Sequence, residues 1–319
     1  MHRPKYIKLI EEASIPLGVK VKHLSDNWAM QLTKNRSVKF IIGNTFPLND
    51  SACYKITGNK NLCSDILTEN NIPNVPHKLL FSPSVQERRK NEKGNSEIIQ
   101  QFILDNGFPF LVKKNNSTKG EGVYIIKNEV ELENVLTKVY STESTLCLSP
   151  FRENIREFRN IVLDGTCLLS YEKQIPFLIG DGKRSIIDLL SEFLKDNKSK
   201  EETKLEKPFD PSLIKNLNII PLRNEKIFLQ LKHNRFLGTK YEEVHNSEIE
   251  KIAVDAAKAI TARFVSVDII HSEKFGFEIL EMSPSVIIHY PINSSTAFND
   301  YDREVEIYRL ALKKLFNIK

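Results

Sequence analysis

Residues 264–283 read FVSVDIIHSEKFGFEILEMS, two apolar runs separated by the glycine at position 276. Runs rich in Val, Ile and Phe that are split by a turn residue predict a β-hairpin. Asp268 lies inside the first run and Glu281 inside the second. A carboxylate in a partly buried strand is costly to desolvate unless it is paired or binds a cation. Two such carboxylates on neighbouring strands can hold one Mg²⁺ while phosphate oxygens complete its octahedron.

The hairpin also has a plainer interpretation, in which its acids lie on the solvent side of alternating strands and bind nothing. We expect Glu278 to be an outward-facing acid of this kind. For Asp268 and Glu281, the hairpin alone leaves both interpretations open. Two interpretations are also available for Arg159 and Lys173, which lie in two earlier apolar segments. They point into a cleft, or they form surface ion pairs, which is the more common case for such residues.

The segment 113–122 reads KKNNSTKGEG and has the composition of a phosphate-binding loop. Expected strands over Phe108–Lys114 and Gly122–Lys127 flank it, and the first of them delivers Lys113. Glycines let backbone N–H groups approach a phosphate, and Ser or Thr hydroxyls add donors. The segment is not a Walker A loop, because it has no GK[ST] ending and no helix follows. An ordinary glycine-containing hairpin loop is the alternative at this point.

Hairpins and helices are mixed along the chain. Short apolar runs predict strands at Lys39–Gly43 and Lys226–Leu231. The dipeptide Asp164-Gly165 is a strong turn signal between expected strands at Arg156–Leu163 and Thr166–Gln174. Apolar residues at helical spacing predict several helices between the strands; these are Asn61–Asn70, Glu129–Val139, Ser185–Leu194, Ser247–Ala262 and Arg303–Phe316. The mixture predicts an α+β fold and not a doubly wound parallel sheet.

The composition excludes several classes of protein. The chain has 319 residues, which suits two or three lobes around a cleft, and its net charge of +5 is a mild bias. The basic residues are interleaved with acids and form no block, so we expect no nucleic-acid partner. No apolar run approaches the ~20 residues that span a bilayer, so we expect no membrane association and a cytoplasmic location. The cysteines have no metal-ligand spacing and are expected to be small buried hydrophobes in a reducing compartment; they are Cys53, Cys63, Cys147 and Cys167.

Taken in order, a set of segments resembles the ATP-grasp superfamily, and most of all its branch with cyanophycin synthetase and the fused glutathione synthetases. The resemblance runs from about residue 50 to about residue 292, and the segments that carry it are GNKNLCSDILTENNIP, VKKNNSTKGEGVYII, REFRNIVLDG, IPFLIGDGKRSI, LKHNRFLGT and VDII with FEILEMSP. It implies the ATP-grasp fold, in which two α+β lobes enclose ATP, here with a short N-terminal lobe. The implied division is a pre-ATP-grasp region at 1–95, a central lobe with the phosphate loop at 96–150 and a C-terminal lobe with the metal-binding carboxylates at 151–319.

The resemblance also assigns roles to single residues. Lys60 and Lys113 match lysines that contact the ATP phosphates, and Glu157 matches the acid that holds the ribose hydroxyls. Leu148 lies in the hinge beside adenine, at 147–151. Asp268 and Glu281 match the carboxylates that bind one or two Mg²⁺ ions, with Mn²⁺ as an alternative ion. The loop over the triphosphate would consist of Ser117, Thr118, Gly120, Glu121 and Gly122. Arg159 matches an arginine that faces the transferred phosphoryl group or the substrate, and Lys173 matches a basic position near the substrate. Lys232 and Asn234 match the end of a strand beside the metal ions, and these four residues are the expected catalytic set.

Three departures from the family pattern concern the site. Ser283 stands where the second metal carboxylate is usually followed by Asn, and a serine hydroxyl is a poorer Mg²⁺ ligand than an amide oxygen. Pro150, in the hinge, has no N–H to offer to adenine. The glycine-rich end of the strand after Asn234 is reduced to RFLGT, which indicates an altered substrate pocket.

The resemblance implies an ATP-dependent carboxylate–amine ligase that forms an amide or peptide bond through an acyl-phosphate. Its substrates would be a small-molecule carboxylate and an amine, such as amino acids or short peptides, and the resemblance allows a homodimer. Two alternatives stay open. One is an ATP-grasp phosphotransferase that stops after phosphoryl transfer, and the other is a non-catalytic nucleotide-binding module, which Ser283 favours.

Overall fold

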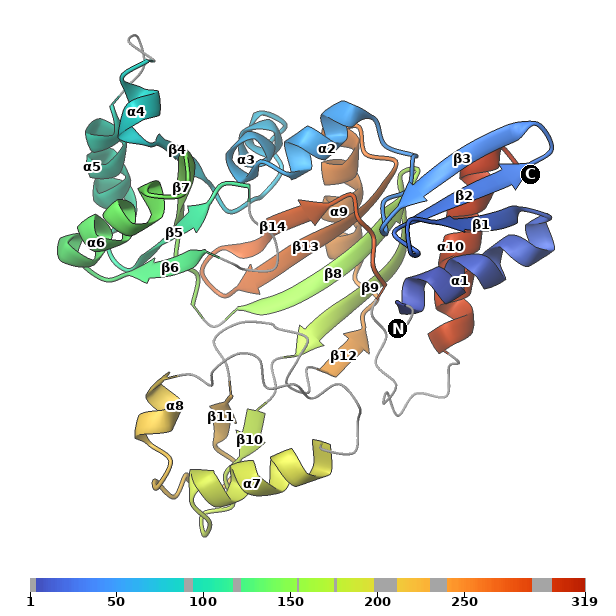
Figure 1. Ribbon diagram of the computed structural model, residues 1–319. Coiled ribbons are helices and arrows are strands. Elements are labelled where there is room, and N and C mark those ends of the chain that lie inside the picture. The colour runs from blue at the N-terminus through green and yellow to red at the C-terminus, as the bar shows by residue number, and fades with distance from the viewer. Residues whose placement is uncertain are drawn as a thin grey trace.

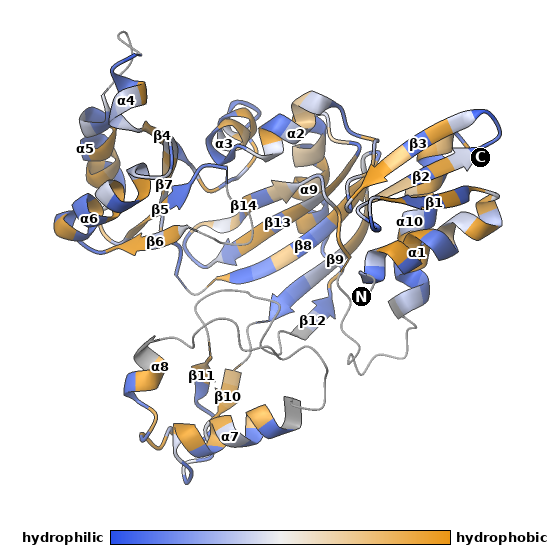
Figure 2. Ribbon diagram, in the orientation of Figure 1, coloured by the Kyte–Doolittle hydropathy of each residue, from blue (hydrophilic) through white to orange (hydrophobic). Residues whose placement is uncertain are grey.

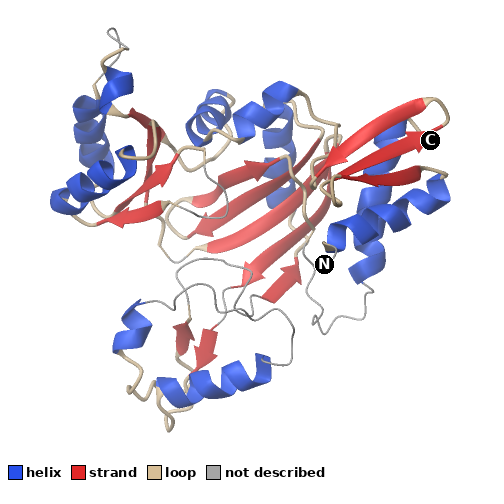
Figure 3. Ribbon diagram, in the orientation of Figure 1, coloured by secondary structure: helices blue, strands red, loops and turns tan. Residues whose placement is uncertain are grey.

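The computed structural model describes residues 4–88, 94–116, 122–153, 155–174, 177–197, 211–229, 240–288 and 300–318. These residues form four sheets with helices packed against them (Figure 1). Strands and helices alternate through most of the chain, as Figure 3 shows, and this confirms the expected α+β class.

The largest sheet is antiparallel, with the order β12-β9-β8-β13-β14. Its strands are β8 (Arg156–Leu163), β9 (Thr166–Gln174), β12 (Lys240–Glu243), β13 (Phe264–Ser272) and β14 (Gly276–Ser283). Both expected hairpins are confirmed, and Asp164 and Gly165 turn the first with positive φ angles of 46° and 78°. Helices α9 (Ser247–Ala259), α2 (Ser51–Thr57) and α3 (Lys60–Glu69) share one core with β13 and β14. Asn246 begins α9 by accepting hydrogen bonds from the N–H groups of residues 248 and 249.

A second sheet, in the order β4-β7-β5-β6, lies beside the first. It consists of β4 (Lys78–Phe81), β7 (Thr145–Pro150), β5 (Phe110–Lys114) and β6 (Val123–Ile126). Phe110, Val112 and Leu148 point to the face that α5 (Asn95–Asn106) and α6 (Glu129–Tyr140) cover, and the short α4 (Pro83–Gln86) follows β4. Because side chains alternate along a strand, Lys113 points to the opposite face. The division of the chain at residues 95 and 150 stays a prediction, and β4, which precedes residue 95, pairs with β7.

The ends of the chain meet at a third sheet, β1-β2-β3. It contains β1 (Lys20–Leu24), β2 (Ala29–Lys34) and β3 (Ser37–Ile42), and α1 (Lys5–Ser14) and α10 (Asp300–Phe316) pack together against it. A single 3₁₀ turn, Ile15–Leu17, joins α1 to the loop before β1. The sequence predicted β3 and α10 but did not predict α1, β1 or β2.

A small unit is inserted between β9 and β12, below the large sheet in Figure 1. Helices α7 (Ile186–Asn197) and α8 (Pro211–Lys215) pack with β10 (Phe177–Ile179) and β11 (Lys226–Phe228) around their own apolar core. The strand expected at Lys226–Leu231 is confirmed as far as residue 228, and positions 230 and 231 lie outside the described residues. Among the helices that the structure describes, none has the length and apolar character needed to cross a membrane.

Candidate active site

The middle of the large sheet buries a cluster of two acids and two bases. Asp268 on β13 lies opposite Arg159 on β8, and Arg159 donates two hydrogen bonds to it, Nε to Oδ1 at 2.7 Å and Nη2 to Oδ2 at 2.6 Å. Lys173 on β9 lies with its Nζ 3.0 Å from Asp268 Oδ2 and also donates to Glu157. Asp268, Glu157 and Lys173 are buried. The charges balance within the cluster, which is the condition for burying them.

The pKa values of this cluster follow from burial and charge together. Burial alone would raise the pKa of Asp268, but Arg159 and Lys173 outweigh that effect and hold its pKa below the usual range. Burial likewise disfavours the charged form of Lys173, and Asp268 and Glu157 reverse this, so its pKa is raised. Asp268 and Lys173 are therefore both ionised at neutral pH. Arg159 and Lys173, which were also consistent with surface ion pairs, lie inside the sheet.

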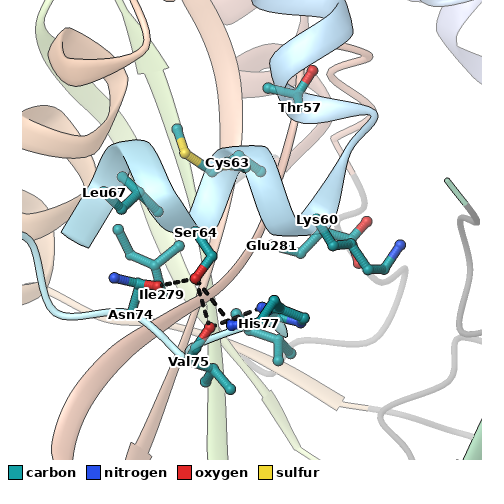
Figure 4. A pocket seen from close by; sticks show the side chains of 12 residues that line it. Thr57, Lys60, Cys63, Ser64, Leu67, Asn74, Val75, His77, Ile279 and Glu281 are labelled. Atoms are coloured by element: carbon teal, nitrogen blue, oxygen red, sulfur yellow. Dashed lines mark hydrogen bonds between the residues drawn. The ribbon is translucent and has the colours of Figure 1, made fainter. Parts of the chain in front are cut away.

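Glu281 adds a carboxylate whose negative charge is balanced less fully by nearby cations than that of Asp268. It lies directly opposite Asp268 in the β13–β14 ladder, beside a β-bulge. Burial and the negative charge of Asp268 raise the pKa of Glu281, and the nearby cations lower it only in part. A buried carboxylate in this situation gains from a positive charge placed next to it. Lys60, the first residue of α3, lies beside it in Figure 4.

A cavity of about 20 Å³, room for roughly one water, joins Glu281 to α3 and to the segment before β4. Figure 4 shows the side chains around it, which come from α2, α3, the 74–77 segment and β14. They belong to Thr57, Lys60, Cys63, Ser64, Leu67, Asn74, Val75, His77, Ile279, Leu280, Glu281 and Met282.

Lys113 reaches the same region from the second sheet. Its Nζ lies 3.4 Å from Nε2 of His77, whose Nδ1 lies 2.8 Å from the carbonyl oxygen of Val75. A ring nitrogen that faces a carbonyl carries the proton, so Nε2 offers its lone pair to the ammonium group. Burial and the charge of Lys113 lower the pKa of His77, which keeps the ring neutral. The sequence did not point to His77, because an isolated histidine carries no spacing signal.

Asn115 links the end of β5 to the start of α3 and was also missed. Its carbonyl oxygen accepts a hydrogen bond from the N–H of Lys60 at 3.3 Å. Its side chain accepts one from the N–H of Asn61 at 3.2 Å and donates one to Asn59 at 3.0 Å. These contacts hold the backbone of Lys60 near the strand that carries Lys113. The run of two asparagines after the strand was the available signal.

The remaining candidates are placed less centrally. Leu148 lies in the helix-covered core of the second sheet, so only its backbone can face a ligand. Gly122 has a φ of 65°, and a Cβ there would lie 2.5 Å from Cγ of Lys114, so the position requires glycine. The hydroxyl of Ser283 is 3.3 Å from the N–H of Ser285 and 3.4 Å from its carbonyl oxygen. Six candidates lie outside the described residues, namely Ser117, Thr118, Gly120, Glu121, Lys232 and Asn234.

The expectation for Glu278 was wrong. Its carboxylate is buried and accepts two hydrogen bonds from Arg152, at 2.6 and 2.8 Å. The guanidinium of Arg152 also lies 3.7 Å from the centre of the Phe275 ring. The connector after β7 supplies Arg152 from 126 positions away along the chain, and strand alternation carries no information about such a contact.

The acids of the site suit a hard divalent cation. Within the described ranges, no group of three or more Asp, Glu, His or Cys side chains converges as a metal site. The pair of Asp268 and Glu281 offers carboxylate oxygens, the ligands that Mg²⁺ prefers, and Mg²⁺ usually takes one or two carboxylates with water and phosphate. Glu281 fits this role because its charge is under-compensated. Asp268 fits it in competition with Arg159 and Lys173.

Comparisons with known proteins identify the fold. No protein-family model matches the chain. The chain resembles a bifunctional glutathione synthetase from Pasteurella multocida, with 14% identity and a TM-score of 0.57 over 97% of this chain and 43% of that protein. It also resembles the ATP-grasp ligase PsnB in complex with a minimal precursor, with 11% identity and a TM-score of 0.50 over 84% of this chain and 64% of PsnB. The protein has the ATP-grasp fold, as its sequence motifs implied.

A curated protein with sequence similarity is the D-alanine–D-alanine ligase of Helicobacter acinonychis (strain Sheeba), which is 24% identical over 110 residues. The match covers 34% of this chain and 30% of that ligase. The chain also spans less than half the length of the bifunctional glutathione synthetase. The shared features are thus a fold over the whole chain and a sequence similarity over one third of it.

Proposed function

We propose that the protein is an ATP-dependent carboxylate–amine ligase. The observation that carries the proposal is the convergence of Lys60, Lys113 and Glu281, from α3, β5 and β14, around one buried region of an ATP-grasp fold. One helix and two strands from different sheets contribute, so the arrangement does not follow from any one hairpin. The ammonium groups of Lys60 and Lys113 suit the oxygens of a triphosphate, and the carboxylates of Asp268 and Glu281 suit its metal ion.

The proposal assigns the nucleotide to the space between the lobes at 96–150 and 151–319. Lys60 and Lys113 bind phosphate oxygens, and His77 holds the ammonium group of Lys113 in place. Glu157 binds the ribose hydroxyls, and the backbone at Leu148 faces the adenine. The loop with Ser117, Thr118, Gly120, Glu121 and Gly122 covers the triphosphate and excludes water.

Asp268 and Glu281 would hold Mg²⁺, with Ser283 as a weaker third ligand, and Mn²⁺ would serve as an alternative. Bound there, the ion neutralises charge on the phosphate oxygens. If Asp268 holds the ion, Arg159 and Lys173, which both contact Asp268, would lie close to the transferred phosphoryl group. They stabilise the negative charge that develops during transfer, which is the main source of catalysis in phosphoryl transfer.

In the first proposed step, an oxygen of the substrate carboxylate attacks the γ-phosphorus. The bond between that phosphorus and the bridging oxygen breaks, ADP leaves, and an acyl-phosphate forms. In the second step, an amine attacks the acyl carbon, and Arg159, Lys232 and Asn234 orient the reactants and bind the oxyanion. Phosphate leaves, the amine nitrogen loses a proton, and an amide remains.

The substrates would be amino acids or short peptides. The similar proteins carry the names glutathione synthetase and D-alanine–D-alanine ligase, and both names denote joining of amino acids or peptides through amide bonds. We assign the selection of the substrates to side chains in the segments 175–184 and 284–302.

One observation favours a second candidate, a nucleotide-binding module without turnover. Ser283 replaces a stronger metal ligand, and its hydroxyl already lies within hydrogen-bond distance of Ser285. Both oxygens of Asp268 also face cations of the protein. Such a module would bind Mg-ATP and release no phosphate with any substrate.

Calorimetric titration with ATP and MgCl₂, run beside a phosphate-release assay over pools of amino acids and dipeptides, tests both candidates. The ligase requires saturable, Mg-dependent binding and phosphate release that a pool stimulates, with an amide product detected by mass spectrometry. Binding without release from any pool would favour the second candidate. Failure to bind ATP would refute both.

A further inference from the structure

The N-terminal sheet exposes apolar side chains on one face. Val38, Phe40 and Ile42 on β3 are 46%, 47% and 52% exposed, and Figure 2 shows hydrophobic stretches along this strand. The opposite face of the sheet is different, since α1 and α10 cover it. There Ile41 is completely buried, next to Met30 on β2. The sheet therefore has one face that helices cover, and on its other face the edge strand β3 leaves a stripe of apolar side chains in contact with water.

β3 also lies at an edge of this sheet. The N–H of Ile42 bonds the carbonyl oxygen of Thr45 at 3.3 Å, so Ile42 directs its backbone groups away from β2. In an antiparallel pair, every second residue does the same. Val38 and Phe40 therefore direct their N–H and C=O groups outward from the free edge of the sheet. At Ile42 the outward-directed groups are already hydrogen-bonded to Thr45. Such an edge is a template for another strand unless charges, proline or a bulge protect it.

The charge around this edge has one sign. From residue 35 to residue 42, the turn before β3 and β3 itself carry two basic residues, Arg36 and Lys39, and no acid. Lys39 lies on β3 between Val38 and Phe40, and its side chain points to the other face of the strand. A strand added to β3 would thus meet an apolar side chain on one face and a lysine on the other.

We propose that the edge of β3 binds an extended acidic peptide segment by strand addition. Apolar side chains of the segment lie beside Val38 and Phe40, and a carboxylate side chain between them lies beside Lys39. The backbone groups of Val38 and Phe40 supply the hydrogen bonds, and the alternating pockets supply the specificity. A second copy of this chain fits less well, because an antiparallel β3 pair brings two copies of Lys39 close together and a like-charge pair is unfavourable.

The test uses a fluorescein-labelled, capped peptide of alternating Val and Glu and follows its anisotropy as the full-length protein is added. We expect saturable binding of this peptide. A matched peptide of alternating Val and Lys, the Val–Lys peptide, should bind at least about tenfold more weakly, because charge complementarity selects partners. Methylation of the backbone nitrogens that face β3 should abolish binding, since it removes the ladder hydrogen bonds. Docking should also change the emission of Trp28, the single tryptophan of the chain, which packs on Gly43 at the end of β3.

Two variants with matched controls make the test decisive. Lys39→Glu should reverse the preference toward the Val–Lys peptide, while Lys215→Glu on α8 should leave it unchanged. Phe40→Ser should weaken binding, while Leu104→Ser, at a more exposed apolar position on α5, should not. The proposal is refuted if neither peptide binds, if both bind equally, or if Lys39→Glu leaves the preference intact. A dimer in sedimentation velocity that Phe40→Ser dissociates would assign the edge to a second copy and overturn it as well.

Discussion

The large sheet and the N-terminal sheet depart in opposite directions from the usual distribution, in which charged side chains are exposed and apolar side chains are buried. The large sheet buries Asp268 and Lys173 in its middle beside the half-buried Arg159, whereas the N-terminal sheet exposes Phe40 and its apolar neighbours. Buried charges and exposed apolar residues are the two informative departures from the usual distribution. Their costs differ, because a buried charge depends on specific partners and an exposed apolar side chain does not. Variants should separate these two kinds of departure by the size of their effects on stability.

Among the substitutions of charged residues, the largest loss of stability is expected for Arg159→Met. The substitution leaves Asp268 buried with one cation fewer, and it should cost about 3 kcal/mol, the low end for a broken buried pair, because Lys173 still contacts the carboxylate. Urea unfolding followed by circular dichroism measures the loss. Arg156→Met is the matched control, since Arg156 lies on the same strand, β8, and makes a similar two-bond contact with Glu172 on β9 but is exposed. It should cost about 0–1 kcal/mol, and equal losses would contradict the buried cluster.

A smaller effect is expected on nucleotide binding when Lys113 is replaced. Lys113→Met removes a charge-assisted contact with phosphate, worth about 1.5–3 kcal/mol, and should weaken Mg-ATP binding at least about tenfold. Calorimetry measures it. The control is Lys114→Met, because the neighbouring lysine points to the other face of β5 and pairs with Glu143 at 2.6 Å. If both variants bind Mg-ATP as the unmodified protein does, the nucleotide site does not include Lys113.

The sequence predicted the parts of the molecule that depend on short-range signals. Asp164-Gly165 requires a turn wherever it occurs, and the apolar stripe of α9 requires a covering sheet, so both were found. The burial of Glu278 depends on Arg152, and the role of His77 depends on a lysine that is 36 positions away. Contacts of this kind arise from the packing of separate elements, which local patterns do not encode. Strands β1 and β2 were missed although Met30 and Leu32 alternate with polar residues in β2, because so short an alternation is a weak signal by itself.

The pH dependence of stability is expected to change with Glu281. Its pKa is raised in the folded protein, so the folded state holds its proton more tightly than the unfolded state. Stability should therefore fall as pH rises from the unfolded pKa through the raised folded pKa, and the full penalty should be present above it. Glu281→Gln should then be more stable than the unmodified protein at neutral pH, in EDTA, and the difference should disappear at pH values below about 4, under the ordinary pKa of a glutamate. A difference that does not depend on pH would show that the carboxylate is not under-compensated.

The smallest effect on stability is expected at the exposed apolar face. Phe40→Ser removes a side chain that water already contacts, so the free energy of unfolding should change by no more than about 0.5 kcal/mol. Ile41→Ala, at the next residue of the same strand, opens a cavity against Met30 and the helices and should cost about 2–5 kcal/mol. Urea unfolding of both variants gives the comparison. If Phe40→Ser costs as much as Ile41→Ala, then Phe40 is already covered in solution, and the apolar edge of β3 has an occupant before any peptide is added.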